Sequence, residues 1–264
     1  MNTNDAKYNS IGKTYNTTRK ADLRITDMII NLLNINATAT VVDIGAGTGN
    51  YSFELAQKGF NILAIEPSQI MREQAKNHRN LRWIKGMAEK LPIKENYADG
   101  VICILATHHF SDLTLAFKEM MRILKSNGKL VIFTFDPRLY SENFWISEYF
   151  DEIVKDAYTI HPSIESLKIQ IEQISNNEAK IIRFPLPENL EDKFFFSGWK
   201  HSEWYLDKAF CRGISSLASL TEKKLDDLLN KLRNDLDNGL WKQKHGNILK
   251  FDAGYYFIVA SKES

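Results

Sequence analysis

Short runs of apolar and β-branched residues alternate with longer segments of helical periodicity from residue 40 onward, and this alternation limits the folds open to the chain. The runs predict five strands, at 40–45, 61–66, 81–86, 99–105 and 129–135. They are nearly continuous in apolar residues, as strands are when helices cover both faces of a parallel sheet. The segments between them predict helices at 50–58, 68–77 and 112–125. The sequence therefore predicts an open α/β sheet with helices on both faces.

Two of these helices carry recognisable end signals. Ser68 follows Pro67 and predicts the N-cap of the second helix. The third helix runs into 126-SNG-128, where Gly128 can take the left-handed backbone conformation that ends many helices.

The pattern changes after residue 135. Further helices are predicted at 143–156, 163–174 and 221–237, and further strands at 179–186 and 249–261. A connection of about 60 residues between the last two strands is too long for a simple loop. We therefore expect a single domain over 1–264, with a core of 22–137, 161–186 and 249–261. A mostly helical cap is expected over 138–160 and 187–248.

The charge balance narrows the range of partners. Lys and Arg total 34 against 33 for Asp and Glu, a net charge of +1, which gives no electrostatic footprint for nucleic acid. The longest apolar run, 101-VICILA-106, is too short to span a membrane. No signal-peptide pattern opens the chain, and Cys103 and Cys211 are lone thiols, so we expect a cytoplasmic protein. No His or Cys cluster has metal-ligand spacing, so no metal is expected.

A glycine-rich turn lies between the first strand and the first helix of the sheet. Gly45, Gly47 and Gly49 stand in 41-VVDIGAGTGNYSFELA-56. Glycine allows a sharp turn and lets a ligand approach the backbone without meeting a Cβ. The spacing is G-x-G-x-G, with Asn50 where the dinucleotide fingerprint G-x-G-x-x-G has its last glycine.

Two carboxylates beside this turn indicate the kind of ligand. Asp43 precedes the first glycine, where it would repel a pyrophosphate but suit a cationic ligand. Glu66 closes the second strand, where a carboxylate can accept hydrogen bonds from both hydroxyls of a ribose. S-adenosylmethionine, a sulfonium that carries a ribose, meets both requirements.

Five stretches in order resemble the class I S-adenosylmethionine-dependent methyltransferases, in particular the small-molecule enzymes with a type 11 core. They are 42-VDIGAGTGNYS-52, 63-LAIEPSQIM-71, 86-GMAEKLP-92, 99-DGVICILATHHF-110 and 119-EMMRILKSNGKLVIF-133. The resemblance covers roughly residues 8–135 and implies a Rossmann-like sheet of seven strands in the order 3-2-1-4-5-7-6, with the last strand antiparallel. It also implies an N-terminal lid over residues 1–21.

The resemblance implies a set of cofactor-binding residues. The turn from Asp43 to Gly47 would hold the methionine portion, Glu66 the ribose, and Leu105 would lie beneath the sulfonium. Met71 or Ile65 would pack on the adenine. The complete set is Tyr15, Arg19, Asp43, Gly45, Ala46, Gly47, Glu66, Pro67, Met71, Met87, Ala88, Glu89, Leu105 and Ala106.

The acceptor side is less constrained. His108 and His109 end the fourth strand, at the edge where ligands bind in open sheets, and are the candidates for a general base. Helix capping or packing would explain them equally well. The predicted acceptor pocket contains Tyr8, His109, Trp199, Trp204, Tyr205 and Arg212. Burial in the cap is the alternative for the aromatic residues, and a structural ion pair is the alternative for Arg212.

The expected function is in-line transfer of a methyl group from S-adenosylmethionine to a small molecule. A hydroxyl or acid acceptor would need a base, whereas an amine or thiol would need only positioning. Two alternatives stay open: an NAD-linked oxidoreductase, and a non-catalytic S-adenosylmethionine-binding regulatory protein. The acceptor is not specified by the sequence, and the protein is expected to be a monomer or homodimer.

Overall fold

The computed structural model describes residues 18–140, 144–247 and 253–263. Its centre is a seven-stranded sheet in the order β3-β2-β1-β4-β5-β7-β6. The strands are β1 (Thr40–Ile44), β2 (Asn61–Ile65), β3 (Leu81–Ile84), β4 (Ala98–Ile104), β5 (Leu124–Phe135), β6 (Lys180–Arg183) and β7 (Tyr255–Ser261). The first five pair in parallel, and β7 is antiparallel to both β5 and β6. The strand order and the reversed strand that the resemblance implied are confirmed.

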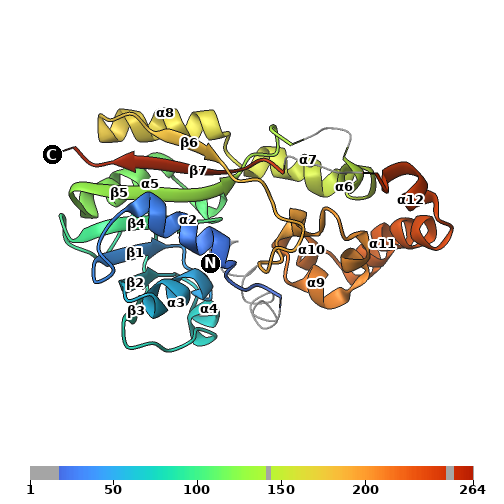
Figure 1. Ribbon diagram of the computed structural model, residues 1–264, viewed down its shortest axis with the longest axis horizontal. Helices are drawn as coiled ribbons and strands as arrows, with labels where there is room; N and C mark the ends of the chain where they lie inside the picture. Colours follow the sequence, from blue (N-terminus) through green and yellow to red (C-terminus); the bar gives the residue numbers. More distant parts are fainter. Residues whose placement is uncertain (1–17, 141–143, 248–252, 264) are drawn as a thin grey trace.

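Helices cover both faces of the sheet (Figure 1). On one face α2 (Leu23–Leu33) and α3 (Asn50–Gln57) share a buried apolar cluster with Val41 of β1. On the other face α5 (Leu113–Ile123) and α8 (Ile164–Ser175) share a second cluster with Val42. Adjacent residues of a strand point to opposite faces, so neighbouring valines enter different apolar clusters. This two-sided burial accounts for the nearly continuous apolar strands.

A group of short helices lies beyond the carboxyl end of β5 (Figure 1). We call it the cap. Its elements are α6 (Trp145–Tyr149), α7 (Asp151–Ile160), η3 (Phe195–Gly198), η4 (Ser202–Leu206), α9 (Lys208–Arg212), α10 (Ser215–Ala218), α11 (Glu222–Asp237) and α12 (Leu240–His245). Aromatic side chains fill its centre: Trp145 is fully buried and donates a hydrogen bond from Nε1 to the carbonyl of Trp199 at 2.8 Å. The described helices of the cap therefore lie beside the sheet and are held together by buried aromatic side chains.

The helix-end predictions have different outcomes. Ser68 caps α4 (Gln69–Glu73), its hydroxyl accepting from the Met71 amide at 3.4 Å. The expected stop at Gly128 is wrong, because α5 ends at Ile123 and β5 begins at Leu124. Asn127, with φ of 62°, takes the left-handed conformation instead. At Gly128 a Cβ would lie 2.8 Å from the Lys125 carbonyl oxygen, so close backbone approach explains that glycine.

Across residues 18–140, 144–247 and 253–263, no helix has both the length and the apolar character needed to cross a bilayer. Within the same ranges, no group of three or more His, Cys, Asp or Glu side chains is arranged to hold a metal ion.

Candidate functional site

A cavity of about 890 Å³ lies between the carboxyl ends of β1, β2, β4 and β5 and the cap. This volume is within the range of small-molecule sites. Fifteen of the residues predicted from the sequence line it: Arg19, Asp43, Gly45, Ala46, Gly47, Glu66, Pro67, Met71, Met87, Ala88, Glu89, Leu105, Ala106, His108 and His109. The predicted Tyr8 and Tyr15 lie outside the described residues.

The glycine turn forms one wall of the cavity. Gly45, Gly47 and Gly49 have φ of 72°, 59° and 76°, in the left-handed region that favours glycine. The amides of Gly45 and Ala46 both donate to the carbonyl of Ile65, at 2.9 and 3.1 Å, which ties the turn to the end of β2. A Cβ at Gly47 would meet no atom within 4 Å, so the backbone there faces open space.

Glu66 is fixed by backbone amides at the end of β2. Its two carboxylate oxygens accept from the amides of Gly47 and Ser68, each at 2.9 Å. Burial raises the pKa of Glu66, and these two hydrogen bonds lower it. A carboxylate has about four acceptor positions, so this one can still accept from a ligand in the cavity.

Asp43 lies behind the glycine turn and is 3% exposed. Its carboxylate accepts a hydrogen bond from the Ser52 hydroxyl of α3 at 2.6 Å. Burial raises the pKa of Asp43 to about 7, the Ser52 hydrogen bond lowers it, and the nearby Glu66 carboxylate raises it further. A cation bound beside Asp43 would favour its charged form.

Residues that follow β2, β3 and β4 complete this side of the cavity. Met71 is buried, whereas Met87 is 48% exposed. Glu89 accepts hydrogen bonds from the amide and hydroxyl of Ser111, at 2.6 and 2.8 Å. Leu105 has φ of 51°, a left-handed conformation that is rare for a leucine and is typical of functional sites.

An ionic link that the sequence did not indicate joins the start of the described chain to the cap. Arg19 pairs with Asp192 at 2.5 Å between Nε and Oδ1, and the Tyr51 hydroxyl of α3 donates to Oδ2 of the same carboxylate at 3.0 Å. Burial raises the pKa of Tyr51 well above its usual value, and the charge of Asp192 adds to this shift. Asp192 lies 173 residues from Arg19 along the chain, so no local pattern could identify it.

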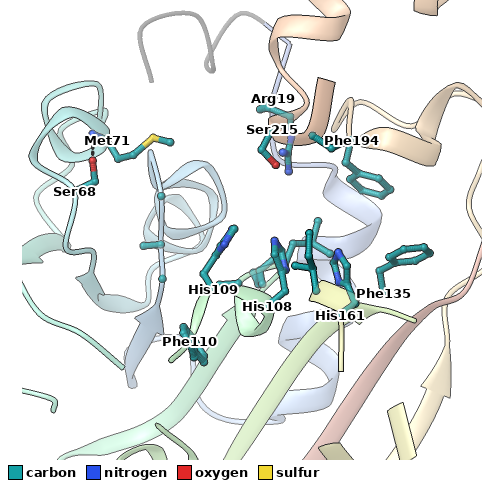
Figure 2. A pocket seen from close by; sticks show the side chains of 18 of the residues that line it. Arg19, Ser68, Met71, His108, His109, Phe110, Phe135, His161, Phe194 and Ser215 are labelled. Atoms are coloured by element: carbon teal, nitrogen blue, oxygen red, sulfur yellow. Dashed lines mark hydrogen bonds between the residues drawn. The ribbon is translucent and has the colours of Figure 1, made fainter. Parts of the chain in front are cut away.

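Three imidazoles lie in a row along the cavity (Figure 2). His108 and His109 belong to η2 (Thr107–His109), with ring centroids 3.8 Å apart, and His161 follows α7 with its ring 4.3 Å from His108. Across the cavity lie Arg19, Ser215 and Phe194. Burial lowers the pKa of His161 to about 4. His108 and His109 are predicted from the sequence, whereas His161 is not.

Four residues of the predicted acceptor pocket do not line the cavity. Tyr205 is wholly buried and packs on Trp145 and Phe150 in the cap. Trp199 is buried in the same cluster. Trp204 stacks on His201 with ring centroids 4.2 Å apart. The Arg212 side chain is 53% exposed and pairs with Glu222 at 3.7 Å. The structure therefore does not bring these four residues to the cavity: the aromatic residues pack within the cap, and Arg212 forms an ion pair at its surface.

The cap presents a different set of residues to the cavity. Most are apolar or aromatic and come from α7, from the segment around η3 and from the segment around α10. They include Ile153, Val154, Ala157, Ile160, Phe194, Phe195, Phe196, Ile214 and Leu220. Among the described lining residues the carboxylates are Asp43, Glu66, Glu89, Asp156 and Asp192, and the Lys and Arg residues are Arg19 and Lys85. The cavity therefore favours a cationic ligand on the sheet side and an uncharged one under the cap.

Known proteins resemble this chain in sequence and in fold. Residues 42–132 match the family model described as a methyltransferase domain. A solved structure from Anabaena variabilis, named as a methyltransferase from an antibiotic biosynthesis pathway, is 40% identical, covers 92% of this chain and 98% of its own, and has a TM-score of 0.88. A relative from Dictyostelium discoideum, named as a methyltransferase, is 25% identical over 98% of this chain and 96% of its own. Phosphoethanolamine N-methyltransferase 2 from Haemonchus contortus, in complex with S-adenosyl-L-methionine, shares the fold at 17% identity. It covers 99% of this chain and 57% of its own, with a TM-score of 0.63.

Proposed function

Because the chain belongs to the class I S-adenosylmethionine-dependent methyltransferases, a family of methyl-transferring enzymes, we propose that its cavity holds S-adenosylmethionine against the ends of β1 and β2. A small-molecule acceptor binds next to it, under the cap. Family membership sets aside the dehydrogenase alternative and the non-catalytic one.

The observation that carries this proposal is the arrangement of Glu66. Its carboxylate is fixed by the amides of Gly47 and Ser68, and it lines the cavity with acceptor positions to spare. A ribose offers two neighbouring hydroxyl donors that match it. Pro67 lies next to it in the lining.

The glycine turn fits the amino-acid end of the same cofactor. Gly47 leaves open space where any other residue would place a Cβ, and the buried Asp43 stands behind the turn as a partner for positive charge. Gly45 and Ala46 supply the rest of this wall. Arg19, held by Asp192, approaches from the N-terminal side and is placed to meet the cofactor carboxylate.

The remaining predicted residues surround the other parts of the cofactor. Met71, Met87 and Ala88 supply apolar contacts for the adenine, with Glu89 close to them in the lining. Leu105 and Ala106 follow β4 and line the cavity between the proposed cofactor and acceptor positions. We keep these roles as proposals for mutagenesis.

The protein contributes mainly alignment and exclusion of water. When bound, S-adenosylmethionine supplies a methyl group on a sulfonium, which departs as a neutral thioether. The cap closes the cavity over the sheet with apolar side chains, so an acceptor can be held in line with the methyl group and away from water. His108 and His109 border this region and are candidates for a base where the acceptor carries a hydroxyl or acid.

The size of the cavity supports an acceptor of metabolite size, since about 890 Å³ must hold the cofactor as well. We place the protein in the cytoplasm, because Cys103 and Cys211 are both free and buried thiols.

Calorimetry with S-adenosylhomocysteine tests the cofactor site. The wild-type protein should bind it, and NAD should give no heat. Glu66→Ala should weaken binding by roughly 10- to 100-fold, since it removes charge-assisted hydrogen bonds. Glu73→Gln changes an exposed carboxylate of α4 and serves as the matched control. Binding of NAD, or unchanged affinity in Glu66→Ala, would refute the assignment.

A further inference from the structure

His161 is held in the cavity by contacts on both its backbone and its ring. Its amide donates to the carbonyl of Ala157 at 2.9 Å, and its own carbonyl accepts from Arg138 at 2.9 Å. The ring lies between His108 and Phe135, with centroid distances of 4.3 and 5.2 Å. These contacts give the imidazole a fixed position at the junction of the sheet and the cap (Figure 2).

The two ring nitrogens of His161 differ in access. Nδ1 is enclosed and has no hydrogen-bond partner among the described residues. The residue nevertheless lines the cavity, so Nε2 is the nitrogen through which the ring can meet a ligand. Burial keeps the imidazole neutral at pH 7, Asp136 favours its protonation, and Arg138 and the adjacent His108 are the other titratable groups that face it. A neutral Nε2 without a proton is a hydrogen-bond acceptor.

The cap wall next to His161 indicates what the acceptor is like. α7 contributes Ile153, Val154, Ala157 and Ile160 to the lining, and the rings of Phe194, Phe195 and Phe196 come from the segment around η3. Flat aromatic side chains of this kind pack well on a ring.

The charged side chains on the cap side disfavour an anionic acceptor. Of the described cap residues in the lining, none is Lys or Arg. The two acidic ones are Asp156, which is exposed, and Asp192, which is paired with Arg19. The cation that lies beside Ser215 and Phe194 is Arg19, and Asp192 already balances its charge. The charge of an anionic acceptor would therefore be buried without a partner of its own, which is costly.

Resting on the proposed function, we infer that the methyl acceptor is an uncharged, ring-bearing hydroxyl compound whose hydroxyl proton is taken by Nε2 of His161. An oxygen lone pair forms the new O–C bond, the C–S bond breaks, and its electron pair stays on sulfur. The O–H bond breaks as Nε2 takes the proton. The positive charge that was on sulfur is then on the imidazolium, so the total charge in the cavity does not change.

A weakly basic imidazole is adequate for this step. As the O–C bond forms, the oxygen gains positive charge and its proton becomes far more acidic than in the free hydroxyl compound. Proton transfer late in the reaction is therefore downhill even to His161. His109 lies toward Met71 and the cofactor side, whereas His161 lies next to Phe135 on the acceptor side (Figure 2).

A matched set of naphthalene probes tests the acceptor class. Calorimetry in saturating S-adenosylhomocysteine compares 2-naphthol, 2-naphthoic acid and 2-(aminomethyl)naphthalene. We expect 2-naphthol to bind at least tenfold more tightly than the anion or the ammonium. If either charged probe binds as tightly as 2-naphthol or more tightly, or if 2-naphthol does not bind, the acceptor is not an uncharged, ring-bearing hydroxyl compound.

Transfer of labelled methyl groups tests His161. His161→Gln keeps a hydrogen-bonding group near Nε2 but cannot take the proton, so kcat for 2-naphthol should fall at least 100-fold with less than a threefold change in KM. A nitro-substituted naphthol is already ionised at pH 8, so as an anion it should bind more weakly but need no base. At saturating concentration its kcat should therefore fall less than fivefold. The slow residual rate with 2-naphthol should rise with pH as the probe ionises. His201→Gln changes a histidine of the cap outside the cavity and is the control.

Failure of this inference can be told apart from failure of the proposed function. Both variants and the wild type should bind S-adenosylhomocysteine within threefold of one another. If they do, two results overturn the role of His161 but not the proposed function. One is an equal loss of kcat with both naphthols in His161→Gln, and the other is 2-naphthol that binds to the wild type but is never methylated. If the wild type does not bind S-adenosylhomocysteine, the proposed function itself fails.

Discussion

The buried carboxyl of Asp43 makes stability and ligand binding depend on pH in a defined direction. Burial raises its pKa to about 7 in the folded chain. In the unfolded chain it titrates near its ordinary value of about 3.9. Between these two values the unfolded chain has already lost the proton that the folded chain still holds. The folded state therefore loses stability as the pH rises from about 4 to about 7.

Asp43→Asn should remove this pH dependence. Urea denaturation at pH 5 and at pH 8 measures the free energy of unfolding of the ligand-free proteins. Between these two pH values the wild type should lose about 1 to 3 kcal/mol more than Asp43→Asn. His161, with its lowered pKa, destabilises the folded state as the pH falls below about 6.5, but it does so equally in both proteins. Asp27→Asn, at a carboxylate that is 59% exposed, should follow the wild type. Parallel pH curves for wild type and Asp43→Asn would contradict the buried-carboxyl account.

The glycine turn allows two substitutions of the same kind to be compared. Gly47 faces open space, whereas a Cβ at Gly49 would lie 2.4 Å from Trp83. Gly47→Ala should cost about 1 kcal/mol from its left-handed backbone and weaken S-adenosylhomocysteine binding at least tenfold. Gly49→Ala has the same backbone cost and adds about 1–3 kcal/mol of overpacking. Calorimetry and urea denaturation separate the two effects, and normal binding by Gly47→Ala would show that this wall does not contact the cofactor.

At the scale of elements, the first four strands of the sheet could be predicted because each is a short apolar run that alternates with a helical segment. β1, β2, β3 and β4 lie within two residues of the predicted bounds. The helix α2 was not predicted, although Ile25, Ile29 and Leu33 have helical spacing and are fully buried. The predicted boundary between α5 and β5 differs from the observed one because a glycine in this position predicts a helix stop, whereas Gly128 is explained by close approach to the Lys125 carbonyl oxygen.

The cofactor half of the site was predictable for the same reason as the strands. Asp43, Glu66 and Leu105 directly follow or end parallel strands, and such ends meet at one edge of a sheet. Asp192 and His161 come from segments whose position depends on how the cap packs, which no local pattern specifies. Among the aromatic residues of 194–205, Phe194, Phe195 and Phe196 line the cavity, whereas the others pack within the cap. Only the folded cap decides between these two positions.

The link between Asp192, Arg19 and Tyr51 can be tested as a connection between elements. Asp192→Ala leaves a guanidinium that is 13% exposed without its carboxylate, which should cost about 3–5 kcal/mol. Tyr51→Phe removes only one hydrogen bond to Asp192 and should cost about 1–2 kcal/mol. Urea denaturation measures both. A smaller loss for Asp192→Ala than for Tyr51→Phe would mean that the ion pair does not stabilise the folded chain.

At the scale of the whole molecule, the sheet and the cap are parts of one apolar cluster. Ile29 of α2 and Phe133 of β5 belong to the same buried cluster as Trp145 and Tyr205 of the cap. The cavity lies where the two meet, and both contribute to its lining. A shared core of this kind favours cooperative unfolding of the two parts.

Thermal unfolding should therefore show one transition that moves as a whole when the cavity is filled. S-adenosylhomocysteine at roughly one hundred times its Kd should stabilise the folded chain by about 2.7 kcal/mol, which for a protein of this size raises Tm by about 5 °C. NAD at the same concentration should leave Tm unchanged, and Glu66→Ala should lose most of the shift because its affinity is lower. Differential scanning calorimetry is the measurement. Two separate transitions, with only one of them moved by the ligand, would mean that the cap unfolds independently of the sheet and that the shared cluster does not couple them.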